Sequence, residues 1–400
     1  MSNRISFPVK NFAAFITAAN TWFNKTSTAY KQGLELCLQQ SGTDLSCSVY
    51  GELNFIEAIL ECPEPVNLPF PLYLDLGQLA KYSFNTNYLY LVLPTEEKMK
   101  SSGLIEYRAQ FKAQDTNFKI PFKPGTGWKK HYLALPTAFS DLQRIKFTKK
   151  FLNENMSLLE LPDSFKVQED LRYQLFERYD GKDFIYAHDY DNMGAYCMEY
   201  KLTNFPEADL RRIRYLSDFL IPLQKGPDYQ HFTLANSKTG GLCYGSAEAA
   251  PDSGIKKFVW AQPTTEKAFD QIPSLLAEHR KTCQWSLSFN TGILADNLET
   301  ATQFFTDAEM REKAIEISAV GERYNISGVL NESEMNVEGP LLEAAPNPVR
   351  IRIQPRCLKD YLKNFDQKAP VNVEVYSATI VLYQNSPDRN LVYWLPVHDR

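Results

Sequence analysis

One short run in this chain combines residue types that could bind a metal or transfer a proton. It contains His188, Asp189 and Asp191, with Tyr190 between the two carboxylates. Imidazole and carboxylate groups serve both as metal ligands and as general acids or bases. The run also lies between two segments with strand patterns, where turns collect polar residues for conformational reasons alone. We therefore interpret it first as a turn, and the alternative is an enzyme of unknown chemistry that needs Asp189 and Asp191.

Other patterns that support chemistry are weak. The seven cysteines are scattered without a Cys-x-x-Cys pair, and the five histidines supply no close pair of zinc ligands. The glycines at Gly125, Gly127 and Gly240-Gly241 sit in turns and do not open a helix after a strand, as a phosphate loop would. The sequence predicts no enzyme, no metal and no cofactor.

Charge distribution is more informative than net charge. The net charge of −5 argues against a generally basic protein, yet the predicted helices are locally basic. Helix exteriors are usually charged and solvated, which is the simpler explanation for any one of them. If the helices face one way, however, their cations could bind a phosphate backbone without sequence preference. The basic residues are Arg144, Lys146, Lys149 and Lys150 in residues 137–155, Arg211, Arg212 and Arg214 in residues 207–220, and Arg356, Lys359 and Lys363 in residues 356–365.

The elements that would position these cations follow a repeated order of strand, helix and further strands. The last 50 residues show it most clearly, because apolar and charged residues alternate over 349–353 and a helical period follows over 356–365. Strands are predicted after it, over 371–384 and 391–397. The preceding unit has strands at 285–289, 314–320, 323–329 and 334–337, with a helix at 291–305.

Four further units are predicted upstream. The first has strands at 4–9, 34–40, 45–50 and 53–60 and a helix at 12–23. The second covers 71–75, 76–84, 89–93, 105–111 and 118–122. The middle of the chain has helices at 137–155 and 207–220, and strands at 173–179, 183–187, 195–202, 231–235, 241–246 and 257–261. Residues 248–254 and 331–348 read as loops rich in Pro, Ala and acidic residues.

A chain of 400 residues is too long for one core. Three α+β domains of two units each, at 1–130, 131–270 and 271–400, fit its length. The hydrophobic content of 44% is that of an ordinary globular protein. Without a membrane-length apolar run or a signal-peptide pattern, we expect a cytoplasmic protein.

Several local sequences resemble one family. Gly42-Thr43-Asp44-Leu45 is typical of an early hairpin turn in bacterial-type DNA polymerase sliding clamps, the beta subunits of the replicative polymerase. Leu171-Arg172-Tyr173 with Leu175-Phe176-Glu177, Ile272-Pro273, and Leu395-Pro396-Val397 resemble later stretches of the same family in the same order.

The resemblance implies a ring-shaped homodimer whose helices line a central hole and whose sheets lie outside. Such a ring encircles double-stranded DNA without sequence specificity, slides on it, and acts as the processivity factor of a DNA polymerase placed by a clamp loader. The DNA-facing residues would be Lys25, Lys81, Arg144, Lys146, Lys149, Lys150, Arg211, Arg212, Arg214, Arg356, Lys359 and Lys363.

The resemblance also implies a pocket that binds a short peptide motif of the polymerase and loader. Its walls would be Asp189, Tyr190, Asn192 and Met193, together with Tyr393, Trp394, Leu395, Pro396 and Val397. The family's turn commonly reads Thr-Asp-Gly-His-Arg-Leu, and residues 188–193 retain only the Asp. Tyr190 in place of Gly reshapes the mouth of the pocket, whereas Met193 can substitute for Leu in shape.

This departure from the family's turn indicates a divergent clamp from a phage or another mobile element. The alternative is a clamp-like binding protein that forms no ring and serves as a decoy or transcription cofactor.

Overall fold

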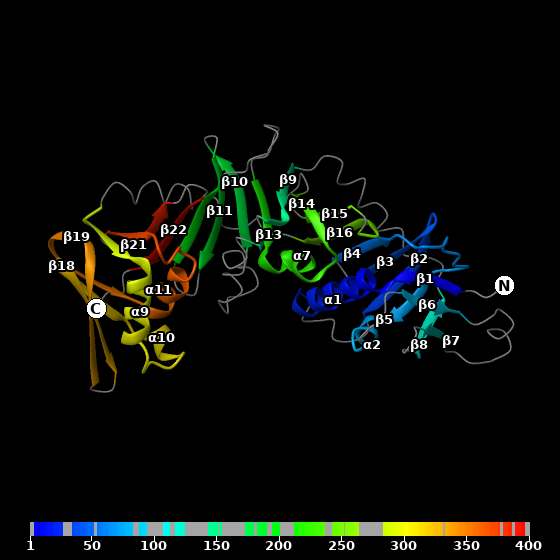
Figure 1. The fold of residues 1–400 in the computed structure, drawn as a ribbon, viewed down its shortest axis with the longest axis horizontal. Coiled ribbons are helices and arrows are strands. Elements are labelled where there is room, and N and C mark those ends of the chain that lie inside the picture. Colours follow the sequence, from blue (N-terminus) through cyan, green and yellow to red (C-terminus); the bar gives the residue numbers. More distant parts are fainter. Residues whose placement is uncertain are drawn as a thin grey trace. The chain divides into compact units, whose positions relative to one another are not determined.

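The structure is a computed structural model in which two compact units are described (Figure 1). One unit comprises Met1–Glu154 and Phe205–Glu266, and the other comprises Asn155–Asn204 and Lys267–Arg400. The described residues are 4–26, 34–51, 54–82, 88–93, 107–112, 117–124, 143–150, 152–153, 173–179, 182–189, 194–200, 212–236, 242–251, 253–263, 283–330, 333–376, 379–385 and 389–396.

The first unit is built on one long antiparallel sheet. Its strand order is β1-β6-β7-β8-β5-β2-β3-β4-β16-β15-β14-β9. The strands are β1 (Arg4–Pro8), β2 (Glu35–Ser41), β3 (Asp44–Tyr50), β4 (Phe55–Leu60), β5 (Leu72–Asp75), β6 (Tyr88–Val92), β7 (Tyr107–Lys112), β8 (Asn117–Pro124), β9 (Gln143–Thr148), β14 (Tyr229–Asn236), β15 (Leu242–Ala249) and β16 (Ile255–Pro263), and β13 (Arg212–Leu216) also lies in this unit. Its helices are α1 (Val9–Thr26), α2 (Leu76–Leu79), η2 (Ser217–Leu220) and α7 (Ile221–Lys225).

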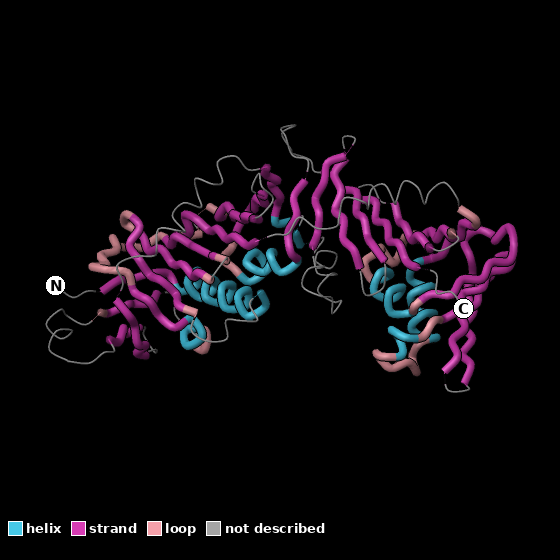
Figure 2. Tube along the Cα trace, turned by 180° about the vertical axis from the view of Figure 1, so that it is seen from behind, coloured by secondary structure: helices cyan, strands magenta, loops and turns pink. Residues whose placement is uncertain are grey.

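Helix α1 covers the core of this unit. Its apolar residues recur every three or four positions, so Phe12, Phe15 and Phe23 are all buried on one side. The ring of Phe12 meets that of Phe7 in β1 edge to face, with centroids 4.7 Å apart. Helix α1 also packs against α7. Burial of these aromatic rings fixes the helices to one side of the sheet, as Figure 2 shows for this unit.

The second unit has its own antiparallel sheet. The strand order within it is β10-β11-β12-β22-β21-β20-β17-β19-β18. The strands are β10 (Tyr173–Tyr179), β11 (Lys182–Asp189), β12 (Gly194–Tyr200), β17 (Trp285–Asn290), β18 (Ile315–Leu330), β19 (Ser333–Ile353), β20 (Pro370–Val375), β21 (Thr379–Asn385) and β22 (Arg389–Pro396). The helices are α9 (Thr291–Ala301), α10 (Glu309–Glu312) and α11 (Pro355–Leu362).

The core of the second unit lies between this sheet and its helices. Alternate residues of β20, Val371 and Val373 among them, are buried, as a strand with one covered face requires. Leu298 of α9 and Leu358 and Leu362 of α11 are each about 1% exposed or less. The two helices therefore bury one stripe each and leave the opposite stripe, which carries their charges, accessible.

At six places in the described chain, a strand is followed by a helical segment either directly or after one residue. This occurs at β1–α1, β5–α2, β13–η2, β17–α9 and β19–α11, and helical residues follow β9 from Lys149. Side-chain caps make two of these turns sharp. Asp75 accepts a 2.7 Å hydrogen bond from the amide of Gln78, and Asn290 accepts one of 3.1 Å from Ile293. The predicted order of strand, helix and strands is thus confirmed in the described residues, as is the α+β class.

Two predicted helices in the middle of the chain are wrong in position. Residues 143–148 form strand β9 inside the predicted helix 137–155, and residues 212–216 form β13 inside the predicted helix 207–220. In both segments cations alternate with apolar residues, as in Arg144-Ile145-Lys146-Phe147, which is the period of a strand. The helical residues begin later, at Lys149 and at Ser217.

The prediction of a loop at 331–348 is also wrong for the described residues of this segment. Residues 333–348 belong to strand β19. The pairing of β18 with β19 shifts register between Ala319 and Arg323, where Gly321 takes φ +58°. Pro346 and Pro348 lie in the unpaired stretch between Ala345 and Val349, and neither has the amide hydrogen that a ladder needs, whereas Pro340 stands opposite Arg323 in the ladder. These prolines gave the stretch its loop-like composition.

No helix among the described residues combines the length and apolar character required to cross a membrane.

Candidate nucleic-acid interface

The short helix α11 positions three of the predicted DNA-facing cations. Pro355 begins the helix, where its missing amide hydrogen costs nothing, and Gln354 precedes it. Leu358, Tyr361 and Leu362 are buried against the sheet and α9. The periodicity of the helix then leaves Arg356, Lys359 and Lys363 on the remaining surface. Prediction of this helix from the sequence is confirmed.

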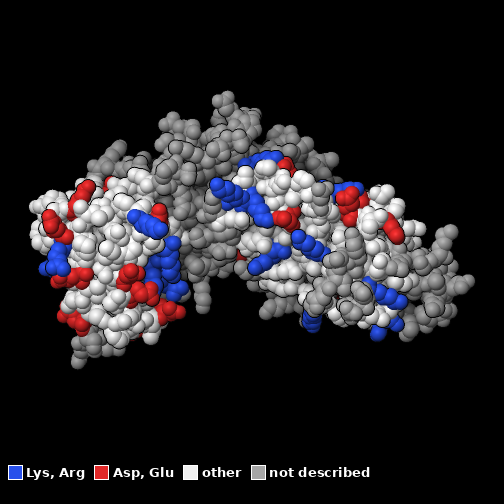
Figure 3. All heavy atoms as spheres, viewed as in Figure 1, with Lys and Arg blue, Asp and Glu red and all other residues white. Residues whose placement is uncertain are grey.

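Each of these three cations is paired with a carboxylate. Lys359 Nζ lies 2.7 Å from Glu299 Oε2 of α9. Lys363 lies 3.3 Å from Asp360 Oδ1. Arg356 lies 3.7 Å both from Asp360 and from Asp307. The three formal positive charges on this surface of the second unit are thus matched by three negative ones, and red and blue side chains lie side by side over α11 in Figure 3.

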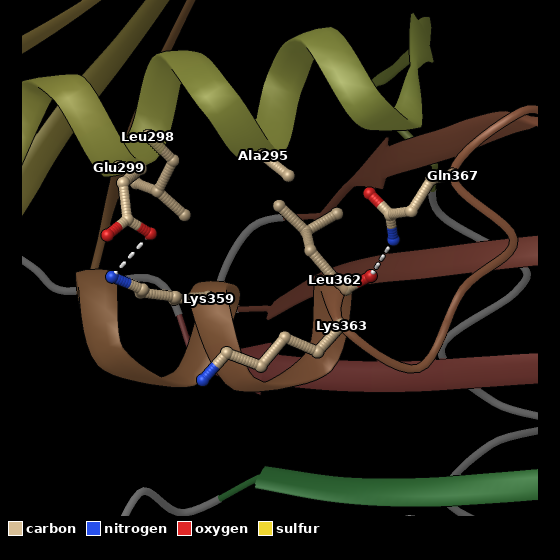
Figure 4. Close-up of a pocket in the computed structure, with 7 residues that line it drawn as sticks. All are labelled: Ala295, Leu298, Glu299, Lys359, Leu362, Lys363 and Gln367. Atoms are coloured by element: carbon tan, nitrogen blue, oxygen red, sulfur yellow. Dashed lines mark hydrogen bonds and ion pairs between the residues drawn. The ribbon is translucent and has the colours of Figure 1, made fainter.

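A pocket of about 260 Å³ opens between α9 and α11 (Figure 4). Its apolar lining comes from Ala295, Leu298 and Leu362, and its polar lining from Glu299, Lys359, Lys363 and Gln367. The Glu299–Lys359 ion pair joins the two helices at one side. On the other side, Gln367 Nε2 donates hydrogen bonds to the carbonyl oxygens of Leu362 and Phe365 at 2.8 and 2.9 Å. The pocket is therefore an apolar cleft with cations at its rim.

The surroundings of Glu299 favour the charged form of its carboxyl. A hydrogen bond from the Lys359 ammonium, and then its charge, lowers the pKa of the Glu299 carboxyl. Glu299 is 69% exposed at its side chain, whereas Lys359 is 27% exposed. Glu299 can therefore leave the pair into solvent, whereas Lys359, which is less exposed, would then need another anion as its partner.

The predicted cations of the first unit are arranged differently from the prediction. Lys149 pairs with Asp228 and lies 5.6 Å from the centroid of the Tyr229 ring. Lys149 lowers the pKa of the Asp228 carboxyl, chiefly through this hydrogen bond. Lys150 is exposed next to it in helical conformation. These two residues do lie in a helical segment, as predicted.

Lys146 belongs to strand β9 and not to a helix. Its neighbour Phe147 is 1% exposed, so Lys146 lies on the opposite face of the strand. There Lys146 Nζ is 2.6 Å from Glu248, which also lies 3.6 Å from His231. Arg144 shares β9, and Arg212 and Arg214 lie in β13, so the helix assigned to them is wrong. Their role toward DNA stays a prediction.

The remaining predicted cations are Lys25, Lys81 and Arg211. Lys25 lies in the last turn of α1, and Lys81 is exposed just after α2. Arg211 lies outside the described residues.

Register brings together part of the predicted peptide pocket. Asp189 pairs with Gly194 across β11 and β12, and the adjoining Ala195 pairs with Trp394 of β22. Trp394 also pairs with the buried Val381, and Leu395 with the buried Ile380. Tyr393 and Pro396 share this strand. Asp189 and Trp394 are thus two strands apart, while Tyr190, Asn192, Met193 and Val397 lie outside the described residues.

The run that could have been a metal or acid/base site lies only partly in the described chain, since His188 and Asp189 end β11. Among the described residues, no group of three or more His, Cys, Asp and Glu residues is placed to hold a metal ion.

Sequence reasoning missed the carboxylates that pair with the cations. Asp360 could have been found, because it stands four residues after Arg356 and three before Lys363 on one helix. Glu299, Asp307, Asp228 and Glu248 come from other elements, so no local spacing reveals them.

No family model matches the sequence, and no curated protein matches it. Solved structures do match over nearly the full length. A protein assigned as a DNA polymerase III beta subunit from Eubacterium rectale has a TM-score of 0.76 at 12% identity, covering 98% of both chains. The DNA polymerase sliding clamp from Bacillus subtilis has a TM-score of 0.74 at 12% identity, covering 99% of both. The DNA polymerase III beta subunit from Thermotoga maritima has a TM-score of 0.73 at 10% identity, covering 99% of this chain and 100% of its own. From end to end, the chain has the fold of bacterial DNA sliding clamps.

Proposed function

We propose that this protein is a DNA sliding clamp. It forms a ring-shaped homodimer that encircles duplex DNA and tethers a replicative polymerase as a processivity factor, without enzymatic activity of its own. The observation that carries the proposal is the likeness of fold to sliding clamps over 98–99% of the chain. The match extends over both compact units of the chain.

The proposed chain organisation is three clamp domains, at 1–130, 131–270 and 271–400. Two strand pairings support continuous sheets across the proposed boundaries. Strand β4 pairs with β16 in the first unit, and β12 pairs with β22 in the second. Such pairings join neighbouring domains through backbone hydrogen bonds, which explains why the chain separates into two compact units rather than three.

Homodimer formation is supported by an open and partly apolar strand. Strand β18 is the last strand in the sheet order of the second unit. Its Val320 and Val329 are 64% and 63% exposed, and Phe304, which follows α9, is 66% exposed. Exposed edges and large exposed apolar residues are hazards for a monomer and are stabilised by pairing with another chain.

The proposed partners dock at the end of β11, β12 and β22. The polymerase and the clamp loader would each bind there with a short peptide, next to Asp189 and Trp394. Tyr190 replaces the small residue usual at this turn, so we propose that the peptides come from the machinery of a phage or another mobile element. The ring would work in the cytoplasm of the bacterial host.

Two measurements test the proposal. Light scattering coupled to size-exclusion chromatography should give a species near twice 45.9 kDa that persists on dilution. A clamp placed on nicked circular DNA by its loader should remain bound at a salt concentration that strips it from linear DNA, because linear DNA lets a ring slide off. A strict monomer, or equal retention on both DNAs, would contradict the ring.

The second candidate is a clamp-like binding protein that forms no ring. The complete pairing of the α11 cations with carboxylates favours it, because a surface that neutralises itself attracts phosphate weakly. This candidate predicts a monomer that is not retained on circular DNA but still binds a polymerase or transcription peptide.

A further inference from the structure

We propose that Glu299 competes with DNA phosphate for Lys359 and thereby sets a weak grip of the clamp on duplex DNA. This inference rests on the proposed function, and it concerns one ion pair of this chain. It assigns Glu299 the role of a positioning residue that holds Lys359 away from DNA, and Lys359 the role of a phosphate ligand once Glu299 is displaced.

Position is the first argument. Lys359 of α11 and Lys363, the residue that caps the C-terminal end of α11, are four residues apart and line the same pocket as Glu299. Two ammonium groups so placed on one helix face could both contact one phosphate group. In the structure, however, Lys359 Nζ lies 2.7 Å from Glu299, as Figure 4 shows. The carboxylate occupies the place at Lys359 where a phosphate oxygen would bind.

The second argument is that helix stability does not account for Glu299. It lies in the last turn of α9, where the partial negative charge of the helix end disfavours another negative charge. Its side chain is 69% exposed, so it fills no core space. The interaction that holds it in this position is the ion pair with Lys359, and the lowered pKa of its carboxyl agrees with a charged form at neutral pH.

The third argument is that Glu299 is more easily displaced than the neighbouring acid. Asp360 is 20% exposed at its side chain and contacts both Arg356 and Lys363 on its own helix. Glu299 reaches Lys359 from another helix, on a longer and more exposed side chain. Exposed ion pairs of this kind are weak and are screened by salt, so a phosphate can replace the carboxylate.

The test uses the full-length protein and a short, fluorescently labelled linear duplex titrated at several salt concentrations. Glu299→Gln should bind roughly 2- to 5-fold more tightly than the wild type, the size expected for release of one exposed ion pair. Its plot of log affinity against log salt should steepen by about 0.9, the signature of one added phosphate contact. Lys359→Gln should remove that gain in the Glu299→Gln background and change the wild type little.

Glu316→Gln is the matched control. Glu316 lies in β18, pairs with Arg350 at 4.0 Å, and alternates with the buried Ile315 and Ile317, so it stands away from the core face. An equal gain for Glu316→Gln would show a general charge effect and overturn the role of Glu299. The role of Glu299 would also be overturned if Lys359→Gln alone, with Glu299 present, lowered the salt slope by one phosphate contact.

Retention on circular DNA is measured in parallel and separates this inference from the proposed function. Retention of the wild type with no change for Glu299→Gln on the duplex would overturn the Glu299 role alone. A steeper salt slope for Glu299→Gln without retention on circles would support that role and reject the ring. Absence of duplex binding by every variant would overturn the Glu299 role, and loss of retention on circular DNA as well would overturn the proposed function.

Discussion

At the residue scale, one glycine shows how closely the first unit is packed. Gly245 of β15 pairs with Trp260 of β16, and the indole lies over it. A Cβ atom at Gly245 would stand 2.2 Å from Trp260 Cε2. Trp260 is fully buried and donates a 2.8 Å hydrogen bond from Nε1 to the carbonyl oxygen of Phe219, so it has little freedom to move.

We therefore expect Gly245→Ala to lower the free energy of unfolding by about 1–3 kcal/mol, the usual cost of overpacking. Urea denaturation followed by tryptophan fluorescence and far-ultraviolet circular dichroism measures it. In a Trp260→Phe background the same substitution should cost less, because the smaller ring leaves room. Equal costs in the two backgrounds would mean that the indole is not the obstacle.

The thiol of Cys62 gives a pH-dependent prediction. Burial, followed by the charges of Asp44 and Glu61 among lesser causes, raises the pKa of Cys62 from 9.0 to about 11. A raised pKa leaves less thiolate at a given pH, and thiolate is the form that reacts. Alkylation of Cys62 by iodoacetamide, followed by mass spectrometry, should rise nearly tenfold per pH unit from pH 7 to pH 10. In urea, the alkylation rate of Cys62 should level off near the ordinary pKa of a cysteine. If the rate in the folded protein already levelled off by pH 9, the prediction would be contradicted.

Residue types alone predicted part of the candidate site. Arg356, Lys359 and Lys363 could be assigned to one helix surface because apolar residues at helical spacing fixed its other side. Their partner Glu299 could not be assigned, because the contact depends on how α9 packs against α11. Local spacing identifies which side chains share a helix face but not which element lies opposite.

At the scale of elements, strands could be predicted where charged and apolar residues alternate without a cluster of cations beside them. The strand at 349–353 was identified because charged and apolar residues alternate there. The same alternation occurs at 143–148 and at 212–216, but Lys149 and Lys150 extend the basic run of the first and Arg211 that of the second. A cluster of cations is also typical of a helix exterior, so the period of two within these segments is the feature that distinguishes the strands.

Helix α9 depends on its first turn. Asn290 ends β17 and its side chain accepts a 3.1 Å hydrogen bond from the amide of Ile293, so one residue ends the strand and caps the helix. Asn290→Ala should lower the free energy of unfolding by about 1 kcal/mol, whereas Asn290→Asp keeps an acceptor and should cost much less. Chemical denaturation of the three proteins measures this. Equal losses for Ala and Asp would show that the cap contributes no more than the strand position.

At the scale of the whole molecule, the order of elements is retained where sequence identity is not. Solved clamps share only 10–12% of residues with this chain, yet nearly every residue of it is covered. Core positions require apolar residues of suitable size rather than particular ones, so the pattern can persist while identity falls. That pattern allowed the repeated units to be read from the sequence. Ring closure depends on complementary surfaces of two chains, which no pattern within one chain reveals.

The open edge of β18 yields the last prediction. Phe304 is 66% exposed, and its neighbour Phe305 lies against Gly328 of β18, so the end of α9 borders this edge. If a second copy covers the edge, burial of Phe304 contributes about 2–3 kcal/mol to the dimer. Phe304→Asp should then weaken dimerisation by roughly 30- to 150-fold, measured by light scattering on dilution. Ile293→Asp is the control, because Ile293 is a 40% exposed apolar residue at the opposite end of α9. A dimer that withstands Phe304→Asp but dissociates with Ile293→Asp would place the contact between subunits at the start of α9 instead.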